Sequence, residues 1–124
     1  MERAVCLDSD VLIALLSGDS SAKEILSTIN ARFCTSAINV FEVWHGRKNT
    51  EPVSELLGKL EVLQFTDTAA RCAADMLCQL KRDGNILDLR DLFIAATCIT
   101  ANSSLLTFNK KHFDRLKKFN LQLV

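Results

Sequence analysis

The chain has 124 residues, of which 48% are hydrophobic, and its 15 basic residues are balanced by 15 acidic ones. This length suits one compact domain, so we expect a single domain over residues 1–124. The hydrophobic content argues against an intrinsically disordered chain. The zero net charge argues against a protein that holds nucleic acid by positive charge alone, but it leaves room for a local basic rim.

The five cysteines are an odd number and form neither a C-x-x-C motif nor zinc-finger spacing. Most lie in apolar stretches, where reduced thiols are usually buried. Acidic residues within the first ten positions come too early for a signal peptide, and apolar runs fall short of the roughly 20 residues that a membrane span needs. We therefore expect a cytoplasmic protein with no membrane partner.

Short apolar segments alternate with segments of helical periodicity along the chain. In chain order the expected elements are a strand at 4–7, helices at 11–16 and 22–30, a strand at 32–35, helices at 37–47 and 52–59, a strand at 61–65, helices at 67–82 and 89–101, a strand at 104–107, a helix at 110–117 and a strand at 121–124. This alternation predicts βαβ units and an α/β fold, a three-layer α/β/α sandwich around a central parallel sheet. In such sheets the functional cleft lies beyond the carboxyl ends of the strands.

Two acidic residues stand where they can reach that cleft. Asp8 directly follows the apolar Val5-Cys6-Leu7, and burying its charge without a partner, water or cation is costly. Asp8 also suits the N-cap of the next helix, with Ser9 and Asp10 as rival caps. Glu42 lies at the margin of an apolar helix face, although an ordinary solvated glutamate would fit the same pattern.

Two further polar residues follow in the second half of the chain. Asp91 lies in the first turn of an apolar helix and shares a face with the small residues Ala95 and Cys98, which let a helix approach the sheet closely. Asp88 and Asp91 also have the spacing of an N-cap and its third residue, and we expect Asp88 to be the cap. Asn109 follows a strand at its carboxyl end, where it can cap the next helix or contribute to the site.

Three carboxylates that converge on one cleft repel each other, and they stay ionised only if a cation or basic groups neutralise them. Oxygen ligands select hard ions such as Mg²⁺ or Mn²⁺. Such an ion activates water and stabilises charge on a phosphoryl group during an in-line displacement. Asp8, Glu42 and Asp91 together therefore indicate phosphodiester chemistry.

Four segments of the chain match known motifs in order and spacing. They are L-D-S-D-V-L-I at 7–13, N-V-F-E-V-W-H-G at 39–46, D-L-F-I-A-A-T at 91–97, and L-L-T-F-N at 105–109 followed by Phe113. Together they resemble the motifs of the PIN-domain family, and in particular the VapC-like toxin ribonucleases of VapBC toxin–antitoxin systems. The third segment is the most specific, and the resemblance covers essentially the whole chain.

The resemblance implies a doubly wound α/β/α sandwich and a Mg²⁺- or Mn²⁺-dependent endoribonuclease, the toxin of a type II toxin–antitoxin pair. It implies that Asp8, Glu42 and Asp91 are the metal ligands and that Asn109 completes the catalytic set. It further implies an RNA substrate, a homodimer, and a VapB-like antitoxin whose peptide tail blocks the cleft.

Two positions depart from the common pattern of the family. Asn109 stands where relatives often have aspartate, and its neutral amide is a weaker ligand. Asp10 stands where many relatives have asparagine or serine, so it either supplies the missing charge or caps the following helix. Ser9 and Thr107 are secondary candidates, because a hydroxyl can hold a carboxylate or a metal-bound water, although local turn bonding accounts for them equally well.

The basic residues near the motif ends form a candidate rim for RNA phosphates, or an ordinary solvated surface. They are Arg47, Lys48, Arg90, Lys110 and Lys111. His45 and His112 are candidates for a general acid or base, and structural histidines fit the same positions. Trp44 suits the core or a dimer interface.

Two other functions remain compatible with parts of the sequence. The first is a catalytically weak or inactive PIN-like module that binds RNA or protein, which Asn109 and the zero net charge favour. The second is a receiver-like signalling domain, for which Asp8 and Asp10 imitate the acidic pair. The second is disfavoured because the sequence lacks a suitable acceptor aspartate and lysine further along.

Overall fold

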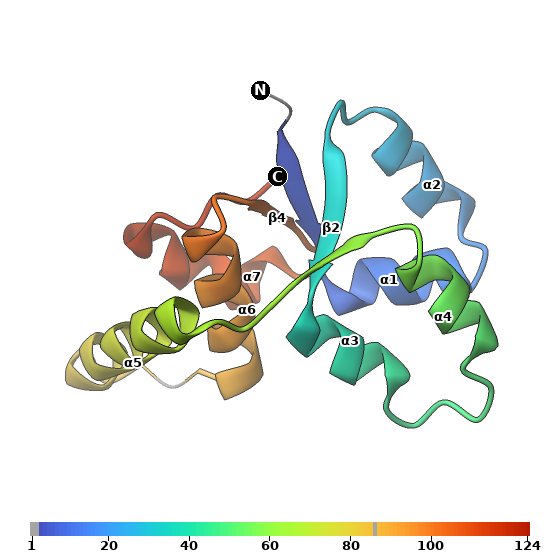
Figure 1. Ribbon diagram of the computed structural model, residues 1–124. Coiled ribbons are helices and arrows are strands. Elements are labelled where there is room, and N and C mark those ends of the chain that lie inside the picture. The colour runs from blue at the N-terminus through green and yellow to red at the C-terminus, as the bar shows by residue number, and fades with distance from the viewer. Residues whose placement is uncertain (1–2, 86) are drawn as a thin grey trace.

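The computed structural model describes residues 3–85 and 87–124 and contains one central sheet (Figure 1). Its strand order is β3-β2-β1-β4, and each adjacent pair is parallel. The strands are β1 Ala4–Leu7, β2 Arg32–Ser36, β3 Glu61–Leu63 and β4 Ser104–Leu106. The chain builds outward from β1 to β3 and then returns to add β4 on the other side of β1. The carboxyl ends of β1 and β4 therefore flank the switch point, where α/β proteins place their sites.

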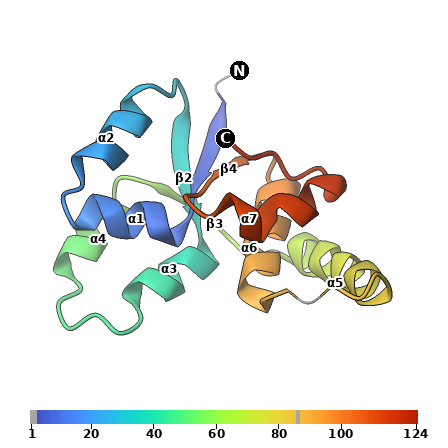
Figure 2. The ribbon, with the colours of Figure 1, turned by 180° about the vertical axis from the view of Figure 1, so that it is seen from behind.

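Helices cover both faces of this sheet. They are α1 Ser9–Leu16, α2 Ser20–Ser27, α3 Ala37–Trp44, α4 Glu51–Leu57, α5 Asp67–Arg82, α6 Leu89–Thr100 and α7 Lys110–Phe113, followed by a 3-10 helix at Asp114–Phe119. Helices α1 to α4 lie on one side of the sheet, and α5, α6 and α7 lie on the other, as the two opposite views agree (Figures 1 and 2). The predicted α/β/α sandwich is confirmed.

The strands alternate their side chains between two apolar cores. Cys6, Cys34 and Leu105 pack with residues of α5 and α6 on one face. Val5 and Leu7 pack with residues of α1, α3 and α4 on the other. Because β1 is buried on both faces, a charged residue is first tolerated where the strand ends, which is where Asp8 lies.

Short polar residues cap the amino ends of several helices. Ser36 caps α3 in a capping box with Asn39. Thr66 caps α5, and Asp88 caps α6 as expected from the sequence. Asp8 caps α1, so α1 begins at Ser9 rather than at residue 11. Asp8 and Ser36 each stand where a strand meets the helix that follows it, so their side chains lie at the carboxyl edge of the sheet.

Several predicted boundaries are wrong. Residues 121–124 form no strand and contribute one bridge, between Leu105 and Leu123. The second helix begins at Ser20 because Asp19 caps it, and α3 ends at Trp44 because Gly46 adopts a left-handed φ of 80°. The expected strand 61–65 stops at Leu63. Within the described ranges, no helix is both long and apolar enough to cross a membrane.

Candidate active site

Asp8 is held at the carboxyl end of β1 by donors from three different elements. Its side chain accepts hydrogen bonds from the Ser9 backbone N–H at 2.9 Å, the Asn39 side-chain amide at 3.0 Å and the Thr107 hydroxyl at 2.7 Å. The residue is only 8% exposed. Asp8 caps α1, as one sequence-based alternative expected. Its carboxylate also lies paired at the end of β1, so capping does not exclude a role in the candidate site.

Glu42 joins Asp8 through a short chain of hydrogen bonds. The Ser9 hydroxyl donates to Glu42 Oε1 at 2.6 Å, and the Asn39 amide donates both to Ser9 Oγ at 2.9 Å and to Asp8. The Glu42 side chain is 20% exposed and lies 3.6 Å from the Arg90 guanidinium. Sequence reasoning missed Asn39, although its position three residues before Glu42 on the same helix face was a usable signal.

Asp91 approaches these carboxylates from the first turn of α6. Burial first, and then the negative charges of Asp88, Asp8 and Glu42, raise the pKa of Asp91 to about 6, against a lowering effect of His112. The His112 Nδ1 lies 3.6 Å from Asp91 Oδ2, and the Asp91 side chain is 21% exposed. Asp8, Glu42 and Asp91 are thus electrostatically coupled in the structure. We call these three residues the acidic cluster.

Asp10, in the first turn of α1, links α1 to the segment after β4 by hydrogen bonding. Its Oδ2 accepts the Phe108 backbone N–H at 3.1 Å, and the Thr107 hydroxyl lies 3.4 Å away. Its Oδ1 is buried and has no hydrogen-bond partner among the described residues. Burial and the charge of Asp8 raise the pKa of Asp10, while the Phe108 amide lowers it. Asp10 is thus one of the site's carboxylates as well as a first-turn residue of α1.

Asn109 departs from the expectation that its side chain caps the next helix. It occupies the position before α7, but its side chain makes no capping hydrogen bond. Its backbone N–H donates to Thr107 Oγ1 at 3.1 Å, and the residue is exposed. The structure therefore brings the Asn109 main chain next to the Thr107–Asp8 contact, without linking its side chain to the acidic cluster.

Two of the predicted basic and histidine candidates border the acidic cluster. Arg90 pairs with Glu42 and with Asp88, and His112 pairs with Asp91. Asp91 and His112 also line a cleft of about 160 Å³, together with Leu87, Asp88 and Arg115. Arg90 and His112 therefore lie beside the carboxylates of the acidic cluster.

The other candidates have no such contact. The side chains of Arg47, Lys48, Lys110 and Lys111 are exposed. His45 stacks on Phe41 with ring centroids 5.5 Å apart and lines a hollow of about 400 Å³ with Trp44 on the outer side of α3. His45 is thus part of an aromatic surface, and Trp44 is exposed rather than in the core.

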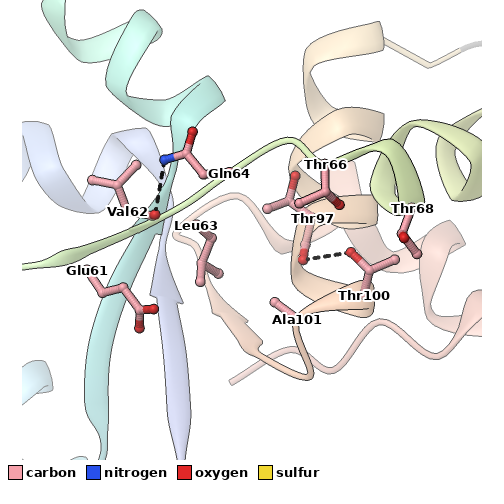
Figure 3. Close-up of a pocket in the computed structure, with 9 residues that line it drawn as sticks. All are labelled: Glu61, Val62, Leu63, Gln64, Thr66, Thr68, Thr97, Thr100 and Ala101. Atoms are coloured by element: carbon pink, nitrogen blue, oxygen red, sulfur yellow. Dashed lines mark hydrogen bonds between the residues drawn. The ribbon is translucent and has the colours of Figure 1, made fainter.

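A larger cavity, of about 450 Å³, lies away from the acids between β3, the start of α5 and the end of α6 (Figure 3). Three of its hydroxyls are already used, since Thr97 and Thr100 donate to main-chain carbonyls of their own helix and Thr66 caps α5. Size alone therefore does not mark the functional site.

The donor set around the acidic cluster consists of oxygens, from carboxylates, hydroxyls and amide groups. Among residues 3–85 and 87–124, no group of three His, Cys, Asp or Glu side chains lies close enough together to hold a metal ion. Glu42 and Asp91 instead contact Arg90 and His112. The buried, unpaired Asp10 Oδ1 and the repulsion among the acids are nevertheless features that a hard cation would relieve.

The protein is a doubly wound α/β protein, with a parallel sheet and with carboxylates at the switch point of that sheet. Residues 5–119 match the PIN domain family, and the chain belongs to that family. The predicted resemblance is confirmed over almost the full length of the chain.

Curated relatives of the chain carry the name VapC. The chain is 35% identical over 120 residues to Ribonuclease VapC10 of Mycobacterium tuberculosis, covering 92% of this chain and 89% of that protein. It is 53% identical over 45 residues, 36% of the chain, to Ribonuclease VapC1 of Methanocaldococcus jannaschii.

Solved structures agree with the fold. VapBC2 from Rickettsia felis, bound to a promoter DNA fragment, superposes with a TM-score of 0.86 at 24% identity, covering 98% of this chain and 97% of that chain. A toxin–antitoxin complex from Klebsiella pneumoniae gives 0.73 at 26% identity and covers 89% of each chain. The α/β architecture is thus shared with chains of these two complexes.

Proposed function

We propose that this chain is a Mg²⁺- or Mn²⁺-dependent endoribonuclease, the toxin of a type II toxin–antitoxin pair. The observation that carries the proposal is the acidic cluster, in which Asp8 and Glu42 are joined through Ser9 and Asn39 and their charges raise the pKa of Asp91 on α6. Its relatives' ribonuclease names support the same activity. Cellular RNA as substrate would place the reaction in the cytoplasm.

Asp8, Glu42 and Asp91 would hold the cation, with Asn109 and Asp10 as further oxygen donors at the same edge. A divalent cation bound there would stabilise the charge that develops on the phosphoryl group during in-line attack by water. Thr107 and Ser9 orient Asp8 and Glu42 by donating hydrogen bonds to them. Arg90 and His112 border the acids and would attract the RNA phosphates to them.

Cleavage should depend on both the ion and the carboxylates. Purified protein is expected to cut a mixed total-RNA substrate with Mn²⁺ or Mg²⁺ and to leave it intact with excess EDTA, since the acids alone repel phosphate. Gel analysis of end-labelled RNA measures this. An Asp91→Asn preparation purified in parallel controls for contaminating nucleases.

RNA binding without cleavage at millimolar Mn²⁺ would contradict the enzyme and favour a binding module. EDTA-resistant cutting by wild type, with Asp91→Asn equally active, would indicate a contaminant.

A VapB-like antitoxin is the partner that fits this proposal. Several structural neighbours are toxin–antitoxin complexes with such partners. An antitoxin segment over the acidic cleft is expected to suppress cleavage in the same assay.

A homodimer through α3 is also part of the proposal. Phe41 is 56% exposed and Trp44 43% exposed, an aromatic surface that a second copy of the chain would cover. Trp44→Lys is expected to shift a dimer to monomer in sedimentation analysis, while the circular dichroism of the fold is kept because Trp44 is exposed in the single chain.

Ile25→Lys is the matched control, because Ile25 is a similarly exposed apolar residue on α2. It should leave the dimer intact. A wild-type chain that sediments as a monomer at tens of micromolar, on the order used for weak dimers, would contradict the proposed interface.

A further inference from the structure

Asn39 occupies a central position in the hydrogen-bond network of the candidate site. It is fully buried in the first turn of α3. Its amide oxygen accepts from the Ser36 hydroxyl at 2.6 Å and from the Ser36 backbone N–H at 3.3 Å. Because Ser36 takes the oxygen, the NH₂ group must face the acids.

Both hydrogens of that NH₂ group are used. One is donated to Asp8 Oδ1 and the other to Ser9 Oγ. The Ser9 hydroxyl, having accepted from Asn39, directs its own hydrogen to Glu42 Oε1. The donors therefore run in one direction, from Ser36 through Asn39 to the two carboxylates, and we call this chain of contacts the amide relay.

We propose that Asn39 is a positioning residue that sets the separation and rotation of Asp8 and Glu42 for cation binding and RNA cleavage. This inference rests on the proposed function. Two carboxylates on separate elements repel each other unless hydrogen-bond donors hold them in place. The amide relay supplies one donor to Asp8 and one to Glu42. The second oxygen of Asp8 is held by Thr107, and that of Glu42 faces Arg90.

A purely structural role for Asn39 makes a different prediction. Asn39 completes the capping box of α3, so its loss would lower the stability of the fold even if the acids were unaffected. A cap alone, however, would leave cation affinity and the catalytic rate unchanged. Measurements of those two quantities therefore separate the two roles.

The first test follows the Asn39 side-chain amide directly by ¹H–¹⁵N NMR. Its signal is assigned by its disappearance in Asn39→Asp. Titration of wild type with Mg²⁺ alone is expected to shift this signal strongly, because its partner Asp8 would bind the ion. The side-chain amide of the exposed Asn30, before the amino end of β2, is the internal control and should not move.

The second test compares Asn39→Ala with Thr35→Val. Thr35 is equally buried, but its hydroxyl donates to the Leu7 carbonyl at 2.8 Å rather than to a carboxylate. Asn39→Ala is expected to weaken Mn²⁺ binding in calorimetry and to lower kcat by roughly 10- to 100-fold, with the KM for RNA much less affected. Thr35→Val should lose stability without either effect.

Ser9→Ala keeps the inference testable if Asn39→Ala does not fold. Ser9 is partly exposed, and its loss breaks only the branch of the relay that reaches Glu42. Weaker Mn²⁺ binding by this variant is expected. Ser9→Ala with the Mn²⁺ affinity of wild type would overturn the relay.

Two results overturn the relay alone, and a third overturns the proposed function with it. If wild type binds Mn²⁺ and cuts RNA while Asn39→Ala matches it in both, the relay alone is wrong. If Mg²⁺ supports cleavage but leaves the Asn39 amide signal in place, the relay is also wrong. If wild type neither binds Mn²⁺ nor cuts RNA, the proposed function and the relay fall together.

Discussion

Replacing Asp91 by asparagine is expected to abolish RNA cleavage and, at the same time, to stabilise the metal-free fold. Loss of a metal-binding carboxylate should reduce cleavage at least about 100-fold. The raised pKa of Asp91, about 6, means that its ionised form is unfavourable in the fold. The neutral amide removes this penalty, so the free energy of unfolding should rise by about 1–2 kcal/mol at neutral pH, after a discount for partial exposure.

The pH dependence of this effect has a definite sign. The folded-state pKa of Asp91 lies above the ordinary value of 3.8, so the penalty is present above about pH 6 and disappears as the pH falls toward 4. Urea unfolding in EDTA should therefore show wild type and Asp91→Asn converging at low pH and differing most above about pH 7.

Asp88→Asn is the control for that comparison. Asp88 caps the same helix, and its pKa is lowered by the Arg90 backbone N–H and side chain. Asparagine caps nearly as well as aspartate, so this variant should not gain stability. An Asp91→Asn protein that is less stable than wild type in EDTA would contradict our account of the cluster.

Replacing Asp8 by alanine is expected to have the opposite effect on stability while also abolishing cleavage. The change leaves the Asn39 amide, the Thr107 hydroxyl and the Ser9 N–H without their shared acceptor. Unpaired buried donors and the loss of an N-cap should together destabilise the fold by about 2–4 kcal/mol. Urea unfolding and the RNA cleavage assay measure the two effects.

Asp19→Ala provides the matched control for Asp8→Ala. Asp19 is likewise an N-cap aspartate, of α2, but it is exposed and accepts hydrogen bonds from Ser21 rather than from buried side chains. Its loss should cost about 1 kcal/mol and leave cleavage unchanged. Equal stability losses in the two variants would mean that Asp8 acts only as a cap.

Much of the fold could be predicted because its determinants are local. These determinants are the apolar run before Asp8, the alternation of strands with helices, and the caps Ser36, Thr66 and Asp88. Each of them depends on neighbouring residues. Predictions were wrong where local signals were weak or tertiary contacts decided. Residues 121–124 look like a strand, yet they form only one bridge beside β4.

The candidate site was predictable in its residue types but not in its connections. The four motif segments identified Asp8, Glu42 and Asp91, and the structure brings these acids together. Asn39 was missed because a buried asparagine on an apolar helix resembles any helix residue until its partner, 31 positions away, is known. The assignment of these residues as metal ligands and of Asn109 as catalytic stays a prediction.

The sequence by itself determined the family, the order of the elements and the placement of acids at strand and helix ends, because these follow from short-range patterns. Only the tertiary structure decided which donors hold which carboxylate: Thr107 on Asp8, Arg90 against Glu42, and His112 beside Asp91. Those pairs lie far apart in the chain, and their geometry arises when the parallel sheet aligns its carboxyl ends. The raised pKa of Asp91 has the same origin, since burial and neighbouring charges exist only in the folded chain.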